Sequence, residues 1–144
     1  MPEVIVIVGG GRNVGKTFLA DAIGKILTDC AVIKLGVHHP RAEKNQLFFE
    51  RGTSYLQILK RAGQRRFLVI ESGAILDDPD LSPDLVIFLP GRDGDKPGSE
   101  IRRAAAHIIR GEPLSDDEIE AIAARLKVQI VEVRRIIDFI ESFD

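Results

Sequence analysis

The stretch that decides the fold of this chain is Val4–Thr17, which reads VIVIVGGGRNVGKT. Its first five residues are apolar and β-branched, which predicts a short strand buried on both faces of a sheet. Residues 10–17 then fit the pattern GxxxxGK[ST], and residues 17–27 repeat apolar side chains at helical spacing. A strand, a glycine-rich turn and a helix in this order are the context that a phosphate-binding loop requires.

The chemistry of such a loop gives its residues defined roles. Glycines let successive backbone N–H groups point at phosphate oxygens, and the positive end of the following helix attracts the same anion. Lys16 would bridge the terminal phosphates, and the Thr17 hydroxyl would hold Mg²⁺. A dinucleotide-binding GxGxxG turn is excluded because Val14 stands where its third glycine would be. The predicted nucleotide-binding residues are Gly10, Gly11, Arg12, Asn13, Val14, Gly15, Lys16, Thr17 and Phe18.

Size and composition limit the class of protein. With 144 residues, 44% of them hydrophobic and 29% charged, the chain has the balance of one globular domain. A net charge of −2 gives no general attraction to nucleic acid or to an anionic membrane. No apolar stretch reaches membrane-spanning length, no secretory signal pattern is visible, and a single cysteine, Cys30, cannot form an internal disulfide. We therefore expect a cytoplasmic protein in which Cys30 is a buried structural thiol.

The rest of the chain alternates predicted strands and helices. Further buried strands are expected at 31–35, 67–70 and 85–89, with a polar loop at 37–51. Helices are expected at Thr53–Arg61, Ser99–Ile109, Ser115–Leu126 and Gln129–Ser142. Short buried strands separated by helices predict an α/β protein with a mostly parallel sheet covered on both faces, the three-layer P-loop NTPase fold.

The composition changes at Pro113, after which glycine and proline are absent. We expect residues 1–112 to form a nucleotide-binding domain and residues 113–144 to form a C-terminal helical pair. Its apolar stripe would pack on that domain or on a second subunit. Ser115, followed three residues later by Glu118, predicts a capping box. The arginines of the second helix alternate with acidic residues, so no basic face favours DNA binding.

Glu71 follows the predicted strand 67–70 and would lie at the carboxyl edge of the sheet, where parallel α/β folds bind ligands. In phosphate-loop proteins an acid at this place holds Mg²⁺ directly or through water, or orients a nucleophile. The alternative is a solvated carboxylate at the rim of the sheet. We predict Lys16 and Glu71 as catalytic residues and Thr17 and Glu71 as metal-binding residues.

Three residues in or after the second strand are candidate substrate contacts. His38 and His39 would lie at the same carboxyl edge, where a histidine can serve as a general acid or base. Polar loop histidines without a function are the alternative, and neighbours on an extended loop make a poor chelating pair. Lys34 is a cation inside a buried strand, so it needs a partner or an exit to the ligand edge.

The nucleobase is not decided by the sequence. The connection at residues 92–98 follows the fourth strand, where many GTP-binding proteins recognise guanine through an Asn-Lys-x-Asp motif. Only the fragment Asp95-Lys96 is present, so GTP and ATP both stay open.

With these segments identified, the chain resembles the molybdopterin-guanine dinucleotide biosynthesis protein B (MobB-like) family of small P-loop NTPases. The similarity rests on residues 4–17, on VIKLGVHH at 32–39 and on FLVIESG at 67–73. It extends through PDLVIFLPG at 83–91 to KPGSEIRRAAAHIIRG at 96–111. The resemblance implies GTP binding, a homodimer, and help in attaching a nucleotide to molybdopterin together with a cofactor-synthesis partner protein.

Our sequence-based hypothesis is therefore a Mg²⁺-dependent GTP- or ATP-binding accessory factor in molybdenum cofactor biosynthesis, with weak NTPase activity at most. One alternative is a small-molecule kinase, for which Arg65-Arg66 and Arg102-Arg103 are candidate phosphate clamps. A second alternative is a regulatory module in which bound nucleotide switches a partner-binding tail.

Overall fold

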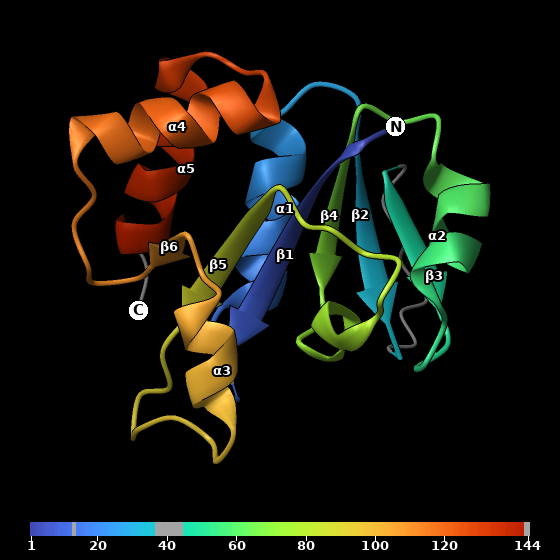
Figure 1. Cartoon of the computed structure of the whole chain (residues 1–144), viewed down its shortest axis with the longest axis horizontal. Coiled ribbons are helices and arrows are strands. Elements are labelled where there is room, and N and C mark those ends of the chain that lie inside the picture. The colour runs from blue at the N-terminus through green and yellow to red at the C-terminus, as the bar shows by residue number, and fades with distance from the viewer. Residues whose placement is uncertain (13, 37–44, 143–144) are drawn as a thin grey trace.

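In the described part of the chain, six parallel strands form a sheet in the order β3-β2-β4-β1-β5-β6 (Figure 1). The computed structural model describes residues 1–12, 14–36 and 45–142. The strands are β1 (Glu3–Gly9), β2 (Cys30–Leu35), β3 (Gln46–Phe49), β4 (Phe67–Glu71), β5 (Leu85–Leu89) and β6 (Ile108–Ile109). The helices are α1 (Lys16–Ile26), α2 (Tyr55–Ala62), α3 (Ser99–Ala104), α4 (Asp116–Leu126) and α5 (Ile130–Ser142), with a 3₁₀ turn η1 (Ala74–Asp77).

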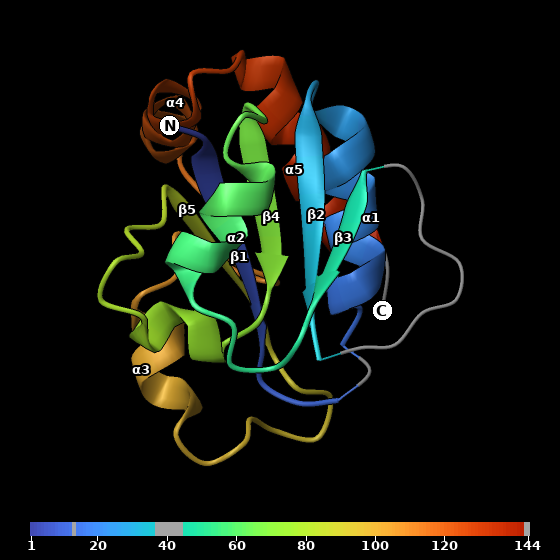
Figure 2. The same ribbon diagram turned by 90° about the vertical axis from the view of Figure 1, so that its right-hand side faces the viewer.

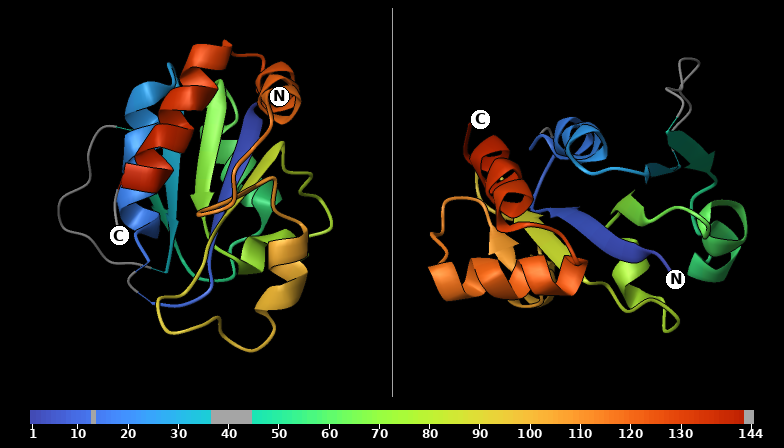
Figure 3. Two further views of the ribbon diagram at one scale, coloured as in Figure 1. Left: turned by 90° about the vertical axis from the view of Figure 1, so that its left-hand side faces the viewer. Right: turned by 90° about the horizontal axis from the view of Figure 1, so that it is seen from above.

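Alternate strand residues build two separate apolar cores, one on each face of the sheet. On one face, side chains such as Ile5 and Ile87 pack with α1, α4 and α5. On the other, side chains such as Val6 and Phe88 pack with α2 and η1. Figure 3 shows α1 and α5 side by side on the first face, and Figure 2 shows α2 in front of the second. The predicted α/β class, with a parallel sheet covered on both faces, is confirmed.

Local signals placed two helices correctly. Ser54 is the N-cap of α2 and accepts a hydrogen bond from the Gln57 amide. Ser115 caps α4 in a capping box with Glu118, as its sequence predicts. A side-chain oxygen at an N-cap satisfies backbone donors that have no partner in the first turn, which is why these short polar signals are reliable.

Two expectations about secondary structure are wrong. Residues 46–49 lie in the segment expected to be a loop, yet they form β3, which pairs with β2 from Val32↔Gln46 to Leu35↔Phe49. The helix expected at 99–109 ends at Ala104, and residues 108–109 form β6 beside β5. In both places pairing with a neighbouring strand outweighs the local preference of the residues.

The C-terminal helices share the core of α1 and β1. Ile122 and Leu126 of α4, and Val133, Ile136 and Ile140 of α5, are buried in the same cluster as Leu19 and Ile23 of α1. Cys30 is buried at the start of β2. In the part of the chain that the structure describes, no helix is both long and apolar enough to cross a membrane.

The connections after β1 and β4 leave the sheet toward opposite faces. The chain after β1 enters α1 on one face, whereas the chain after the neighbouring strand β4 enters η1 on the other. Such a reversal opens a crevice at the carboxyl ends of adjacent parallel strands, which is where open α/β sheets bind ligands. The topology therefore selects the ends of β1 and β4 as the place to look for a site.

Candidate functional site

Residues 9–17, called here the glycine loop, connect β1 to α1. Gly15 is the N-cap residue of α1 with φ of 94°, a left-handed conformation that glycine adopts without strain. Val14 is buried in the core, so its side chain anchors the loop to the sheet. Lys16 and Thr17 begin the helix, and this puts both side chains at its positive end.

Thr17 and Glu71 are in direct contact across 54 residues of sequence. The Thr17 hydroxyl donates a 2.8 Å hydrogen bond to Glu71 Oε1. Sheet register explains this, because Glu71 is the last residue of β4 and lies beside Ile7 of β1, just before the glycine loop. The two residues predicted to hold a metal are therefore brought together by the pairing of two parallel strands.

Lys34 completes this cluster from the other side of β4. The β2–β4 register aligns Lys34 with Glu71, and the Lys34 side chain is only 4% exposed. Its Nζ lies 3.5 Å from Glu71 Oε2 and 3.3 Å from Asp21 Oδ1 of α1. Among described residues neither Lys34 Nζ nor Glu71 Oε2 has a partner in hydrogen-bond geometry, so their contact is an ion pair without a formed hydrogen bond. The partner that a lysine in a buried strand requires is thus found.

The Thr17–Glu71 pair fits a magnesium site of the type that keeps several waters. Mg²⁺ is usually bound by one or two protein oxygens together with substrate phosphates and water. A threonine hydroxyl at a helix start, hydrogen-bonded to a carboxylate, offers two such oxygens. Because Lys34 faces the other oxygen of Glu71, the Oε1 side, next to Thr17, is where this carboxylate can act on a hydrated cation.

The end of β5 and the loop between β5 and α3 hold the glycine loop through backbone hydrogen bonds. Gly10 donates to the Leu89 carbonyl, and the Lys96 amide donates to the Gly10 carbonyl. A Cβ at Gly10 would lie 2.2 Å from Asp95 Oδ1, so only glycine allows this approach. Asp95 Oδ1 also accepts the Gly91 amide at 2.9 Å. Asp95 therefore lies against Gly10 of the glycine loop and also binds Gly91 within its own β5–α3 loop.

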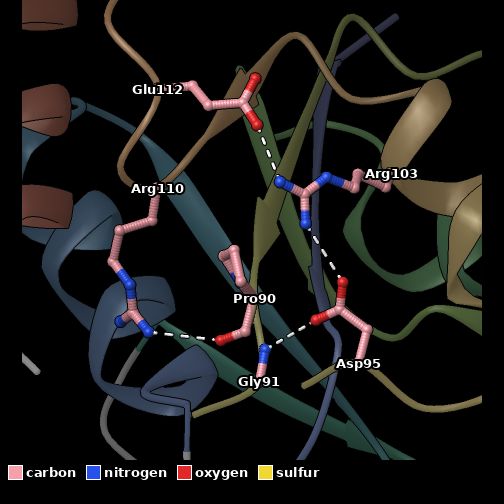
Figure 4. A network of polar contacts seen from close by, with 6 residues as sticks. All are labelled: Pro90, Gly91, Asp95, Arg103, Arg110 and Glu112. Carbon is pink, nitrogen blue, oxygen red and sulfur yellow. Dashed lines mark hydrogen bonds and ion pairs between the residues drawn. The ribbon is translucent and has the colours of Figure 1, made fainter. Parts of the chain in front are cut away.

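Two arginines extend this network to β6 and its end (Figure 4). Arg103 bridges Asp95 Oδ2 at 3.1 Å and Glu112 Oε2 at 2.8 Å, and its bond to Glu112 raises its pKa. Arg110 donates to the Val14 carbonyl at 3.1 Å and to the Pro90 carbonyl at 3.4 Å. Sequence reasoning missed Asp95 and Arg110 as supports of the glycine loop. No local signal points to them, because they act on residues far away in the sequence.

A cavity of about 800 Å³ opens beside Lys16 and Glu71, on the α2 and η1 side of the sheet. Its walls come from Leu35 at the end of β2 and from the segments that follow β3 and β4, together with Lys96 and Arg102. Of the four arginines considered as phosphate clamps, Arg102 alone lines it. For Arg65 and Arg66 a clamp role here is wrong: they bind Asp29 and the Lys127 carbonyl, next to the amino end of β4.

Phe18, the last residue of the predicted binding segment, is 62% exposed and stacks on Phe139 of α5, with ring centroids 5.4 Å apart. Asn13, His38 and His39 lie outside the described residues, so their predicted roles stay predictions.

No protein-family model matches the chain, and neither a curated protein nor a solved structure matches it.

Proposed function

We propose that this chain is a P-loop protein that binds a nucleoside triphosphate, GTP or ATP, with Mg²⁺ at the glycine loop. The observation that carries the proposal is the Thr17–Glu71 hydrogen bond at the crevice between β1 and β4. It joins a GxxxxGKT loop at a helix start to an acid at the end of the neighbouring strand. Phosphates would meet loop amides and Lys16, and the hydrated metal would meet Thr17 and Glu71.

The biological role that we propose is an accessory function in molybdenum cofactor biosynthesis, positioning a nucleotide for attachment to molybdopterin in a homodimer with slow hydrolysis at most. Its support is the resemblance of residues 4–17, 32–39 and 67–73 to the MobB-like family. Rapid turnover requires a residue that activates an attacking group. Glu71 is already engaged by Thr17 and Lys34, which favours metal positioning over proton abstraction.

A second candidate is phosphoryl transfer to a small acceptor. The observation that favours it is that Arg102 and Lys16 line the same cavity. An acceptor in that cavity would face the terminal phosphate, and an arginine there can neutralise charge on the transferred group. Analysis of the products from ATP or GTP incubated with a small-molecule extract would distinguish a phosphorylated acceptor from free phosphate.

The test of nucleotide binding is calorimetric titration of the full chain with GTP and ATP. Lys16→Ala removes the charge on the terminal phosphates and leaves the loop backbone in place, so affinity should fall tenfold or more, about 1.4 kcal/mol per decade. The matched control is Lys25→Ala, since Lys25 is an exposed lysine at the other end of α1. Equal affinity in the Lys16 variant and in the control would contradict the proposal.

The magnesium role has its own experiment. Glu71→Gln keeps the size of the side chain and removes its charge, so nucleotide affinity measured with Mg²⁺ should fall, whereas affinity in EDTA should stay close to that of the parent. An equal loss in both conditions would mean that Glu71 acts on the loop and not on the metal.

A further inference from the structure

The cavity beside the glycine loop has cationic residues in addition to Lys16, the one cation there that the proposed nucleotide would use. Four cationic side chains reach its wall: Lys16, Arg51, Lys96 and Arg102. Lys16 comes from the start of α1 and Arg51 from the turn after β3, whereas Lys96 and Arg102 come from the β5–α3 loop and from α3. A volume of about 800 Å³ lies within the range of sites that hold metabolite-sized ligands.

The acidic residues of the cavity are largely satisfied by other groups. Glu71 is paired with Lys34 and Thr17. Asp78 accepts the Tyr55 amide at 2.8 Å and the Asp80 amide at 2.9 Å, and these two bonds lower its pKa. Glu71 and Asp78 are therefore used inside the protein. Asp80 is a third acidic residue on the described wall and is exposed, so the four cationic residues there outnumber the acidic ones.

Arg102 lies close to Gly73 in the cavity wall. A Cβ added to Gly73 would lie 2.3 Å from Arg102 Nη1, so a larger residue at this position would push the guanidinium aside. Its ion pair with Asp77 is long, at 3.8 Å, and the Asp77 side chain is 81% exposed. A surface pair of this kind is weak, so the planar guanidinium can still bind a carboxylate or a phosphate through two parallel hydrogen bonds.

The position of the cavity also separates it from the nucleotide. Among the described residues of the glycine loop, Lys16 alone lines the cavity, and in a loop of this type the lysine contacts the terminal phosphates. The rest of the nucleotide would follow the loop amides toward α1, on the opposite face of the sheet. The space in front of Lys16 therefore lies beyond the last phosphate.

We propose that this cavity binds a second, anionic small molecule, bearing a phosphate or carboxylate group held by Arg102, at the same time as the nucleotide. The proposal rests on the proposed function for the identity of the first ligand. The second ligand, bound in this cavity, faces the terminal phosphate of the nucleotide across Lys16.

The test is an amide-shift titration of the isotope-labelled full chain, saturated with ADP and Mg²⁺. The probes are glycerol phosphate and succinate, which distinguish phosphate from carboxylate recognition, with uncharged glycerol as the control. Binding should shift the amides of Gly52 and Gly73 in the cavity and leave those of Gly11 and Gly15 unchanged. Arg102→Gln should lower the affinity of the tighter-binding probe about tenfold, because one charge-assisted contact is lost. The affinity for ADP should not change.

The control variant is Arg135→Gln, because Arg135 is an exposed arginine of α5 and does not line the cavity. Gly73→Ala provides an independent variant, since its methyl group would displace the Arg102 guanidinium and weaken the probe in the same way. Shifts confined to the glycine loop, equal shifts with glycerol, or unchanged probe affinity in Arg102→Gln would overturn the proposal. Failure of ADP to bind would instead count against the proposed function. The same titration without ADP would then still test whether the probes bind to the cavity.

Discussion

Replacing Lys34 with methionine gives the most direct test of the charge cluster behind the glycine loop. The substitution keeps most of the side-chain length but removes the ammonium that lies 3.5 Å from Glu71 Oε2 and 3.3 Å from Asp21 Oδ1. Asp21 keeps its hydrogen bond from Gln46 and a side chain that is 32% exposed. Glu71, whose side chain is 15% exposed, loses the cation that faces its buried oxygen.

The expected loss of unfolding free energy follows from this difference between Asp21 and Glu71. Removing one partner of a buried ion pair leaves an uncompensated charge, and this typically costs about 3–5 kcal/mol of unfolding free energy. The Thr17 hydrogen bond to the other oxygen of Glu71 remains, so we expect the lower end of that range, about 3 kcal/mol. This is a large share of the total stability of a domain, about 5–15 kcal/mol.

The assay is urea unfolding of Lys34→Met, Glu71→Gln and the double variant, with Lys60→Met as the matched control on the exposed side of α2. Once Glu71 is neutral, removing Lys34 should cost less than it does alone, and the coupling between the two positions should exceed about 1 kcal/mol. If Lys34→Met unfolds within about 0.5 kcal/mol of the control, the argument that Lys34 compensates a buried Glu71 would be refuted.

Three further outcomes are expected. Burial, with the neighbouring charge of Arg125, lowers the pKa of His107, so the unfolded chain binds more protons below about pH 6.5 and stability should fall as the pH decreases through this region. His107→Gln should remove up to about 1.4 kcal/mol per pH unit of that slope in urea unfolding, and an unchanged slope would contradict the assignment. Burial raises the pKa of Cys30 to about 12, so a thiol reagent at about pH 8 should modify the denatured chain only; rapid labelling of the native protein would contradict this. Ile136→Ala in α5 removes a fully buried side chain and should cost about 2–5 kcal/mol, whereas Val131→Ala, at a position 53% exposed, should cost about 0.5 kcal/mol or less; equal costs would mean that α5 does not pack as described.

The elements that the sequence predicted well depend on signals within a few residues. The β-branched run of β1, the glycines after it and the apolar spacing of α1 each report a local preference. The capping residues Ser54 and Ser115 likewise act on amides three residues away. Glu71 could be assigned to the carboxyl edge because a parallel sheet puts all strand ends of one kind on one side.

The tertiary structure alone decided which distant residues meet. β3 and β6 are short edge strands whose hydrogen-bond partners lie in β2 and β5, so their sequences carry no adequate local signal. Lys34 is acceptable in a buried strand because strand register places it beside Glu71 and helix packing brings Asp21 to it. Asp95 supports the glycine loop through contacts across 85 residues of sequence, from Gly10 to Asp95. The sequence determined the central strands, most of the helices and the chemistry that they offer. Register and packing determined the edge strands and which charges face one another, because those contacts exist only after the chain has folded.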